Sequence, residues 1–163
     1  MKRKILRFPN PVLRKKAKAV KRVTPEIVKL IDDMIETMQA APGIGLAAPQ
    51  VGQSARVIVA DVGEGPIVLV NPKILSKSGK QIFTEGCLCL PGVEAPVERA
   101  SQVAVKGLDR AGRSITIEAK ELLATVLQHE IDHLDGLVFI DRVLDPSLIK
   151  HVAFEKEKKE ELI

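Results

Sequence analysis

One pentapeptide constrains this chain more than any other feature: His129-Glu130-Ile131-Asp132-His133. Two histidines four residues apart point to the same side of a helix, because a helix completes one turn in about 3.6 residues. Neutral imidazole is a good ligand for borderline divalent metals. A glutamate beside the first ligand is placed to act as a general base on metal-bound water. The motif therefore predicts a metal-dependent hydrolase whose site is carried by one helix.

The residues before this motif indicate that the helix is buried. Leu122, Thr125 and Val126 lie seven, four and three positions before His129, so they share its face. That face is largely apolar, and a buried histidine pair needs partners that a metal supplies well. Gly136 is the expected C-cap of the helix. A histidine pair on a solvated surface is the alternative, and the apolar context disfavours it.

The motif leaves the third metal ligand open. A catalytic site usually has three protein ligands and one open position. One class of zinc proteases places a third histidine where this chain has Phe139, and another uses a downstream glutamate, for which Glu155 is the candidate. Glu155 lies in a charged run, residues 155–161, that is typical of a solvated helix. His151 is expected on the same helix as an ordinary, partly exposed side chain.

The two cysteines, Cys87 and Cys89, are better candidates. A thiolate binds divalent metals strongly and lowers the net charge of the site. Residues two apart face the same way in an extended segment, and this spacing makes a disulfide between them strained. The alternative is two buried cysteines that act as small apolar side chains. The residues alone leave both interpretations open.

Three segments together carry a resemblance: GIGLAAPQ at residues 43–50, EGCLC at residues 85–89 and QHEIDH at residues 128–133. In this order and spacing they resemble the peptide deformylase family, and the likeness runs from Phe8 to Arg142. The resemblance implies hydrolytic removal of the formyl group from N-formylmethionine at the start of new bacterial proteins, with release of formate.

The resemblance also implies a role for each matching residue. Glu130 would be the general base and then the acid, Gly45 would lend its backbone to the bound peptide, and one divalent ion is implied, Fe(II) natively with Zn(II) or Ni(II) as substitutes. The implied metal ligands are Cys87, His129 and His133. The implied oxyanion donors are the Gln50 carboxamide and the backbone N–H of Leu88. The implied pocket for the methionine side chain comprises Gly43, Ile44, Leu88, Leu122, Thr125 and Val126.

Two positions depart from the family pattern. Cys89 stands where relatives usually have serine, which puts a second sulfur near the metal and makes oxidation of the site easier. Register favours Cys87 as the ligand. Glu94 stands where many relatives have an arginine or an aromatic residue that touches the substrate, so peptide contacts beyond the first residue are not predicted.

The chain is expected to form one α+β domain, residues 1–163, with antiparallel sheets of short strands around the central metal-binding helix. Thr24 and Pro25 begin an N-terminal helix that Pro42 and Gly43 end. The metal helix is expected at about residues 122–135, and a C-terminal helix from residues 145–146 to the end. Strands are expected at residues 56–61, 67–71, 81–85, 102–108 and 114–118, with a hairpin turn at residues 109–112.

Charge is uneven, because ten lysines and arginines precede Glu26, the first acidic residue. Such a surface attracts polyanions, so transient, salt-dependent contact with the ribosome is a hypothesis, through this region, the C-terminal helix or both. A solvated basic surface is an equally good interpretation. Aromatic residues make up 2% of the chain, which disfavours base stacking, and no DNA partner is expected. No apolar run approaches the roughly 18 residues of a membrane span, and two unpaired cysteines fit the cytoplasm.

Two rival functions are weighed against a formyl-peptide hydrolase. A zinc endopeptidase is disfavoured by Phe139 and by a chain of 163 residues, which leaves little room for an extended cleft. A catalytically silent ribosome- or RNA-associated protein that keeps its metal for stability is disfavoured by Glu130 and Gln50, because a purely structural metal needs neither.

Overall fold

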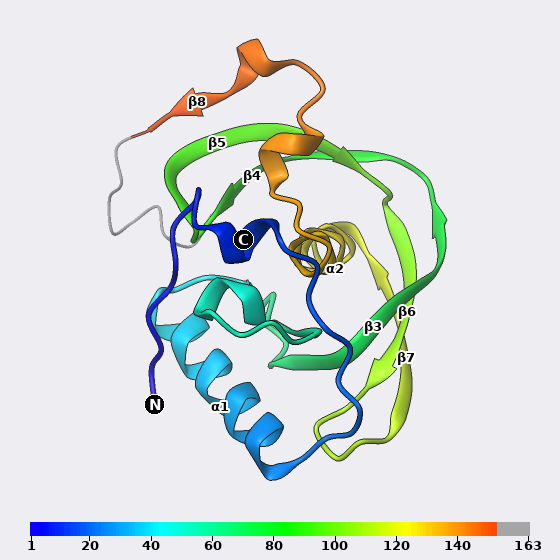
Figure 1. Cartoon of the computed structure of the whole chain (residues 1–163). Helices are drawn as coiled ribbons and strands as arrows, with labels where there is room; N and C mark the ends of the chain where they lie inside the picture. Colours follow the sequence, from blue (N-terminus) through cyan, green and yellow to red (C-terminus); the bar gives the residue numbers. More distant parts are fainter. Residues whose placement is uncertain (153–163) are drawn as a thin grey trace.

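The computed structural model describes residues 1–152 and has an α+β fold built on two sheets (Figure 1). The strands of both sheets pair antiparallel, as expected. The larger sheet has the order β1-β2-β3-β6-β7, with strands at Gly45–Ala47, Val57–Ala60, Ile67–Ser78, Gln102–Leu108 and Ser114–Lys120. The smaller sheet has the order β4-β5-β8, with strands at Gln81–Cys87, Leu90–Arg99 and Lys150–His151.

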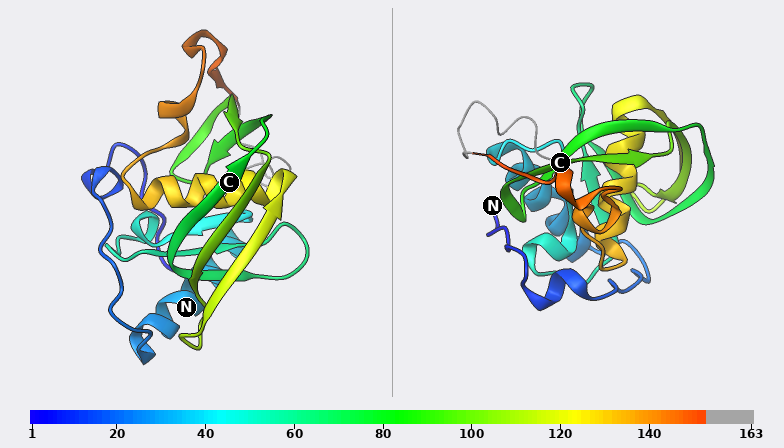
Figure 2. Two further views of the ribbon diagram at one scale, coloured as in Figure 1. Left: turned by 90° about the vertical axis from the view of Figure 1, so that its right-hand side faces the viewer. Right: turned by 90° about the horizontal axis from the view of Figure 1, so that it is seen from above.

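Helix α2, Glu121–Leu134, lies between the two sheets. It is seen end-on in Figure 1 and from the side in the left view of Figure 2. Every residue from Ala124 to Leu134 is buried, so the expectation that this helix is buried is confirmed. Leu127, Ile131 and Leu134 pack into a core shared with the larger sheet. Burying one such side chain contributes about 1.5–3 kcal/mol, which fixes the rotation of α2 and hence the direction of its polar side chains.

Helix α1, Pro25–Ala40, forms as the sequence predicts. The Thr24 side chain accepts a hydrogen bond from the Ile27 backbone N–H, and Pro25 occupies the first turn. The buried face of α1 follows helical spacing and packs against β2; it consists of Leu30, Ile31, Met34 and Met38. None of the helices within residues 1–152 has the length and apolar character that a membrane crossing needs.

One predicted strand is longer than expected, and strands β5 and β1 were not predicted. Strand β3 continues seven residues beyond Asn71. Asn71 has a φ of 54°, and the pairing register shifts after Val70. Both features interrupt the alternating pattern by which a strand is predicted. Strand β5 was not predicted, because Pro91, Gly92 and Pro96 normally argue against a strand. It forms because β4 pairs along its whole length. The short strand β1 was also missed.

The predicted C-terminal helix does not begin at Asp145. Asp145 instead caps a single 3₁₀ turn, Pro146–Leu148, by accepting a hydrogen bond from the Ser147 backbone N–H at 2.9 Å. The chain then becomes strand β8, in which exposed His151 pairs with Val93 of β5. The rest of that prediction, residues 153–163 with Glu155, lies outside the described residues.

Candidate metal centre

Sulfur and nitrogen atoms from two distant parts of the chain converge beside α2. Cys87 is the last residue of β4, and its Sγ lies 3.2 Å from His133 Nε2 and 3.2 Å from Cys89 Sγ. His133 Nε2 lies 3.2 Å from His129 Nε2. The potential ligand atoms form two groups that share His133, one with Cys87 and Cys89 and one with His129 and Glu130, each within 4.8 Å. The cysteines are free thiols, as their spacing predicts.

The orientation of His129 is fixed by groups outside this cluster. Its Nδ1 lies 2.8 Å from Glu85 Oε1 and donates to that carboxylate, which leaves Nε2 to face His133. Phe139 stacks on the imidazole at 6.2 Å between ring centroids, with an interplanar angle of 21°. The position at which a zinc protease would carry a third histidine therefore holds a packing residue of the core.

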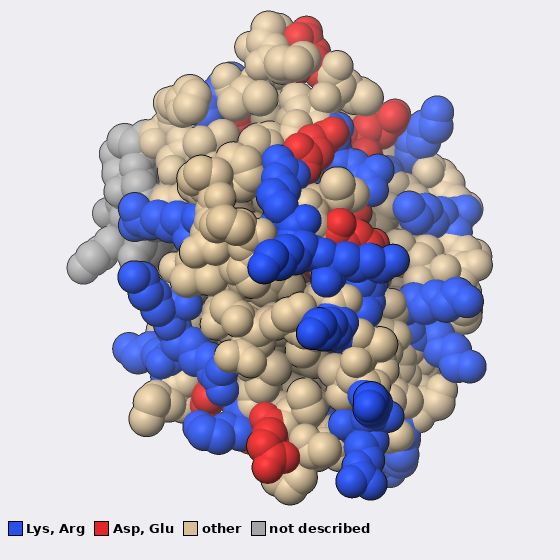
Figure 3. All heavy atoms as spheres, viewed as in Figure 1, with Lys and Arg blue, Asp and Glu red and all other residues tan. Residues whose placement is uncertain are grey.

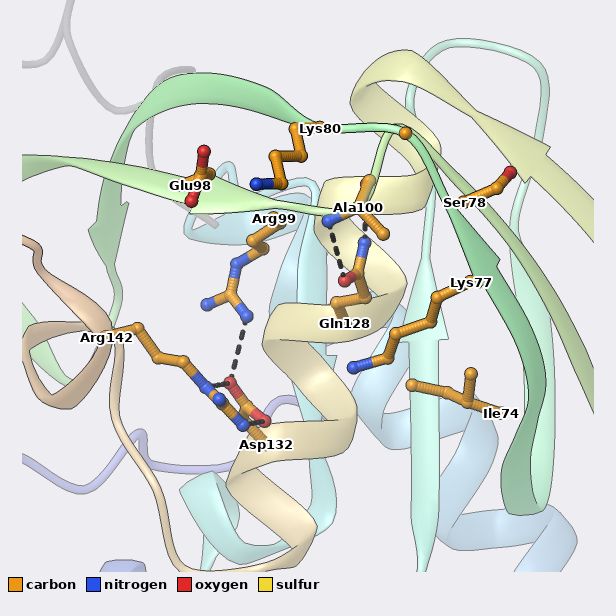
Figure 4. A pocket seen from close by; sticks show the side chains of 11 residues that line it. Ile74, Lys77, Ser78, Lys80, Glu98, Arg99, Ala100, Gln128, Asp132 and Arg142 are labelled. Carbon is orange, nitrogen blue, oxygen red and sulfur yellow. Dashed lines mark hydrogen bonds and ion pairs between the residues drawn. The ribbon is translucent and has the colours of Figure 1, made fainter.

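Glu85 belongs to a chain of ion pairs beside α2 that is buried at Glu85 and Arg99 and reaches the surface at Arg142. Arg99 donates to Glu85 from Nε at 2.6 Å and from Nη2 at 3.0 Å, and from Nη1 to Asp132 at 2.9 Å. Arg142 donates to both oxygens of Asp132 at 2.9 Å. Figure 4 shows Asp132 held between the two arginines at the edge of a cavity of about 440 Å³. That cavity is lined by Gln128 and Asp132, and neither histidine of the pair is among its lining residues.

Within residues 1–152, Glu130 has no hydrogen-bond partner for its carboxylate. Its carboxylate is fully buried, and both oxygens are without a hydrogen-bond partner among residues 1–152. Gly45 on β1 faces it so closely that a Cβ at this position would collide with Glu130 Oε2 and come within 2.9 Å of Val126. The small size of Gly45 thus makes room for the carboxylate.

Gln50 lies at the end of a 3₁₀ turn, Ala48–Val51, directly after β1. Its Oε1 accepts a hydrogen bond from the Ala47 backbone N–H at 2.8 Å, which fixes the amide orientation. Its Nε2 therefore points inward and lies 3.4 Å from Cys87 Sγ. Leu88 lies next to Cys87 in the turn between β4 and β5. Both groups expected to donate hydrogen bonds thus stand beside the cluster.

The apolar side chains expected to form the methionine pocket belong to two clusters of the core. Ile44, Leu122 and Val126 belong to the same apolar cluster in the core. Gly43 lies against Leu88, since a Cβ added to it would come within 2.8 Å of that side chain. The Thr125 hydroxyl accepts a hydrogen bond from Gln81 Nε2 at 2.8 Å, a partner that the sequence did not indicate.

The donor set fits a divalent cation. Burial raises the pKa of the Cys87 thiol and of the Glu130 carboxyl well above their usual values, and it lowers the pKa of His133 well below its usual value. Burial is the largest cause of all three shifts, because charge is costly away from water; the positive charge of Arg99 offsets only part of the effect on Glu130. A bound divalent cation would supply a countercharge at the site, keep the thiolate deprotonated and take neutral imidazole as ligand. The unpartnered oxygens of Glu130 are consistent with the same need.

Sequence reasoning missed the ion pairs that support the ligands: Glu85, Arg99, Asp132 and Arg142. The signal was partly present, because Glu85 opens the EGCLC segment and Asp132 lies inside the HEIDH motif. A charged residue at a position expected to be buried needs a partner. Nothing in the sequence says that Arg99 and Arg142 are those partners.

Comparison with known proteins identifies relatives along almost the whole chain. A family model described as polypeptide deformylase matches residues 2–148. The peptide deformylase of Dictyoglomus thermophilum is 49% identical over 148 residues, which is 91% of this chain and 97% of the relative. The peptide deformylase of Halothermothrix orenii is 54% identical over 142 residues, which is 86% of this chain and 92% of the relative.

Solved structures agree with these sequence relatives. The crystal structure of a peptide deformylase from Legionella pneumophila has a TM-score of 0.86 and 47% identity, and covers 90% of this chain and 88% of its own. That of a peptide deformylase from Synechococcus elongatus in complex with actinonin has a TM-score of 0.85 and 44% identity, and covers 87% of this chain and 79% of its own.

Proposed function

The chain belongs to the polypeptide deformylase family, and from this premise we propose how its own residues remove the formyl group from the N-terminal formylmethionine of newly made proteins. The reaction is the metal-dependent hydrolysis of a linear amide that releases formate. The observation that carries the proposal is a buried, unpartnered Glu130 carboxylate beside a converging set of sulfur and imidazole ligands. An endopeptidase would need a cleft that holds the substrate peptide on both sides of the cleaved bond, whereas a formyl group needs only a small closed site.

Cys87, His129 and His133 are proposed to hold the metal. When bound, a divalent cation supplies Lewis acidity and lowers the pKa of water toward neutrality. His129 keeps its ligand nitrogen directed inward because Glu85 accepts the proton of the other ring nitrogen. Fe(II) is the proposed native ion, with Zn(II) or Ni(II) as substitutes, and the proposed compartment is the cytoplasm.

Glu130 is proposed to move the proton. Its carboxylate accepts a proton from the attacking water and passes it to the amine that leaves. Burial supports this role, because it raises the pKa of Glu130 well above the usual value for a carboxyl group and so favours uptake of a proton. Gly45 supports it as well, since only a glycine leaves space for this carboxylate.

Gln50 and Leu88 are proposed to stabilise the negative oxygen that forms during attack. The Gln50 carboxamide is held by Ala47, so its N–H donors already face the site. The Leu88 backbone N–H would donate from the adjoining turn. A preorganised donor of this kind is worth on the order of a hundredfold in rate.

The substrate is proposed to enter along β1. Gly45 would offer its backbone polar groups to the peptide, whose extended chain could hydrogen-bond to an adjacent strand. The methionine side chain would lie among Gly43, Ile44, Leu122, Thr125 and Val126. Three of these are apolar side chains of one cluster, which suits a thioether side chain.

The test is an assay of formate release from a formyl-methionyl peptide and from its acetyl counterpart, with anaerobically purified, metal-analysed protein. Turnover of the formyl peptide alone is expected, because the space beside Glu130 is so crowded that even a Cβ at Gly45 would collide with its carboxylate. Glu130→Gln should retain the metal and lose most turnover. Absence of formate release from metal-loaded wild-type protein would disprove the proposal.

Transient ribosome contact through the basic N-terminal segment, residues 2–22, is a second proposal. Nine of its ten lysines and arginines are exposed, and Arg3 is partly buried in an ion pair with Asp33. Figure 3 shows basic side chains spread over the face that this segment crosses. Phosphate contacts of this kind weaken steeply with salt.

Cosedimentation with ribosomes at low and high salt tests this contact. A triple variant, Lys15→Gln with Lys16→Gln and Lys18→Gln, should lose most of the low-salt binding. Its matched control removes three exposed lysines elsewhere, Lys77, Lys80 and Lys106. Equal loss in both variants, or no binding by wild-type protein at low salt, would rule out a contact through this segment.

A further inference from the structure

A charged cavity lies beside α2, and the proposed mechanism does not use it. Its volume is about 440 Å³, and it is bordered by α2, by the turn between β3 and β4, and by the end of β5 (Figure 4). Its charged lining residues are Lys77, Lys80, Glu98, Arg99, Asp132 and Arg142. We propose that this cavity binds a phosphate group, carried either by a small molecule or by an RNA backbone.

The two lysines give the cavity an excess of positive charge. The arginines of the lining are balanced by Glu85 and Asp132, whereas neither Lys77 nor Lys80 forms an ion pair with any residue that the structure describes. Glu98 is the one acidic side chain left to oppose them among the described lining residues. Figure 4 shows the lysines extending from the two sides of the turn between β3 and β4 toward the region of α2. An anion in the cavity would offset this excess.

The arginines also keep N–H groups available for an oxyanion. A guanidinium has five N–H groups. Among residues 1–152, Arg99 uses three of them and Arg142 uses two, all in hydrogen bonds to Glu85 and Asp132. The planar fork of a guanidinium matches the oxygen atoms of phosphate, and a lysine adds a point charge with further donors. The lining therefore combines the two kinds of cation that suit a phosphate group.

The walls of the cavity are fixed by contacts within the protein. Gln128 on α2 donates from Nε2 to the Ala100 carbonyl at 2.9 Å and accepts from the Ala100 N–H at 3.2 Å, which joins α2 to the end of β5. In the turn that separates the lysines, Gly79 has a φ of 69°, and a Cβ there would collide with the Ser101 hydroxyl. Because these walls are already ordered, an entering anion has little ordering cost to meet.

The cavity is separate from the proposed metal centre. None of Cys87, His129, Glu130 and His133 is among its lining residues. The phosphate site therefore does not rest on the deformylase mechanism. Failure of formate release would leave it standing, and loss of phosphate binding should leave formate release unchanged.

Calorimetric titration of zinc-loaded protein with inorganic phosphate, at constant ionic strength, tests the site. Saturable binding with a Kd of about 1 mM or lower is expected. The double variant Lys77→Gln with Lys80→Gln should weaken binding about tenfold or more, because it removes two charged donors from exposed positions. The matched control, Lys73→Gln with Lys106→Gln, removes two exposed lysines that pair across β3 and β6 outside the cavity, and it should keep the wild-type Kd.

Three results would overturn the proposal. The first is no saturable binding up to about 10 mM phosphate, at which a site with a Kd of about 1 mM is roughly nine-tenths filled. The second is wild-type affinity in the Lys77 and Lys80 double variant, which would place the ion elsewhere, such as at the metal. The third is equally strong binding of acetate, which would show no preference for phosphate.

Competition then distinguishes the two sources of the phosphate group. Displacement of bound phosphate by glycerol 3-phosphate, but not by a short single-stranded RNA, would support a small-molecule ligand. Displacement by the RNA, lost in the Lys77 and Lys80 double variant, would support a backbone phosphate of RNA.

Discussion

Replacing Glu85 by glutamine should show what the hydrogen bonds behind the proposed metal ligands contribute, because the substitution changes none of those ligands. Glu85 accepts three hydrogen bonds, from Arg99 Nε at 2.6 Å, from Arg99 Nη2 at 3.0 Å and from His129 Nδ1 at 2.8 Å. Glutamine keeps the size of the side chain but has one acceptor oxygen where glutamate has two. Because all three partners donate, the amide N–H groups of glutamine would face an N–H of Arg99 or His129, and at least one of the three hydrogen bonds would be lost.

The expected cost follows from burial. Arg99 is 4% exposed and Glu85 is not exposed at all. Removing one partner of a buried ion pair costs about 3–5 kcal/mol, and the low end applies because Asp132 still pairs with Arg99. We therefore expect the free energy of unfolding to fall by about 3 kcal/mol. The loss of the hydrogen bond to His129, a proposed metal ligand, should also weaken metal affinity by roughly tenfold to hundredfold.

Urea denaturation measures the first effect, and competition with a chelator measures the second. A loss of about 3 kcal/mol lowers the urea midpoint by roughly 1–3 M, given slopes of about 1–3 kcal/mol per molar. Glu118→Gln makes the same chemical change on the exposed side of β7 and should alter neither quantity. Wild-type stability together with wild-type metal affinity in Glu85→Gln would refute this account of the buried ion pairs.

Three further outcomes follow from the geometry. Gly45→Ala should lower kcat at least tenfold with the metal retained, because its Cβ displaces Glu130; metal analysis beside formate assays checks this, and wild-type kcat would contradict it. Gly136→Ala should destabilise the protein by more than about 1 kcal/mol in urea, since φ is 78° and the Cβ meets the Arg14 carbonyl; an unchanged midpoint would exclude that contact. Burial raises the pKa of Asp132, but its two arginine partners lower it by more than burial raises it, so the pKa in the folded protein lies below the ordinary value. As pH falls, Asp132 is therefore protonated first in the unfolded chain. Its contribution to the free energy of unfolding is fully present above the ordinary pKa of aspartate and is lost as the pH falls through the pKa of the folded protein. Asp132→Asn should therefore reduce the loss of stability on acidification below about pH 4, and an unchanged acid slope would argue against this linkage.

The local sequence was enough to predict much of the fold. Helical spacing and an N-cap predicted α1, and Gly136 adopts the left-handed conformation expected of a C-cap. Strand β6 has the predicted bounds, because its alternation is regular. Prediction failed where local signals conflict with pairing, as in β5, whose prolines are tolerated because β4 fixes its register. It failed again at Asp145, where pairing with β5 prevails over a helix-start pattern.

By itself, the sequence determined the chemistry of this protein: two histidines one helical turn apart, a carboxylate beside them, and cysteines and a glutamine in segments that resemble one enzyme family. Covalent identity and helical period suffice for that, because both are local. Only the tertiary structure decided what surrounds those groups. It placed Glu85 behind His129, left Glu130 without a hydrogen-bond partner in the part of the chain that the structure describes, and brought the sulfur of Cys89 into contact with that of Cys87. These relations join residues far apart in the chain or depend on the direction of buried side chains, and both are set by the packing of α2 between the two sheets.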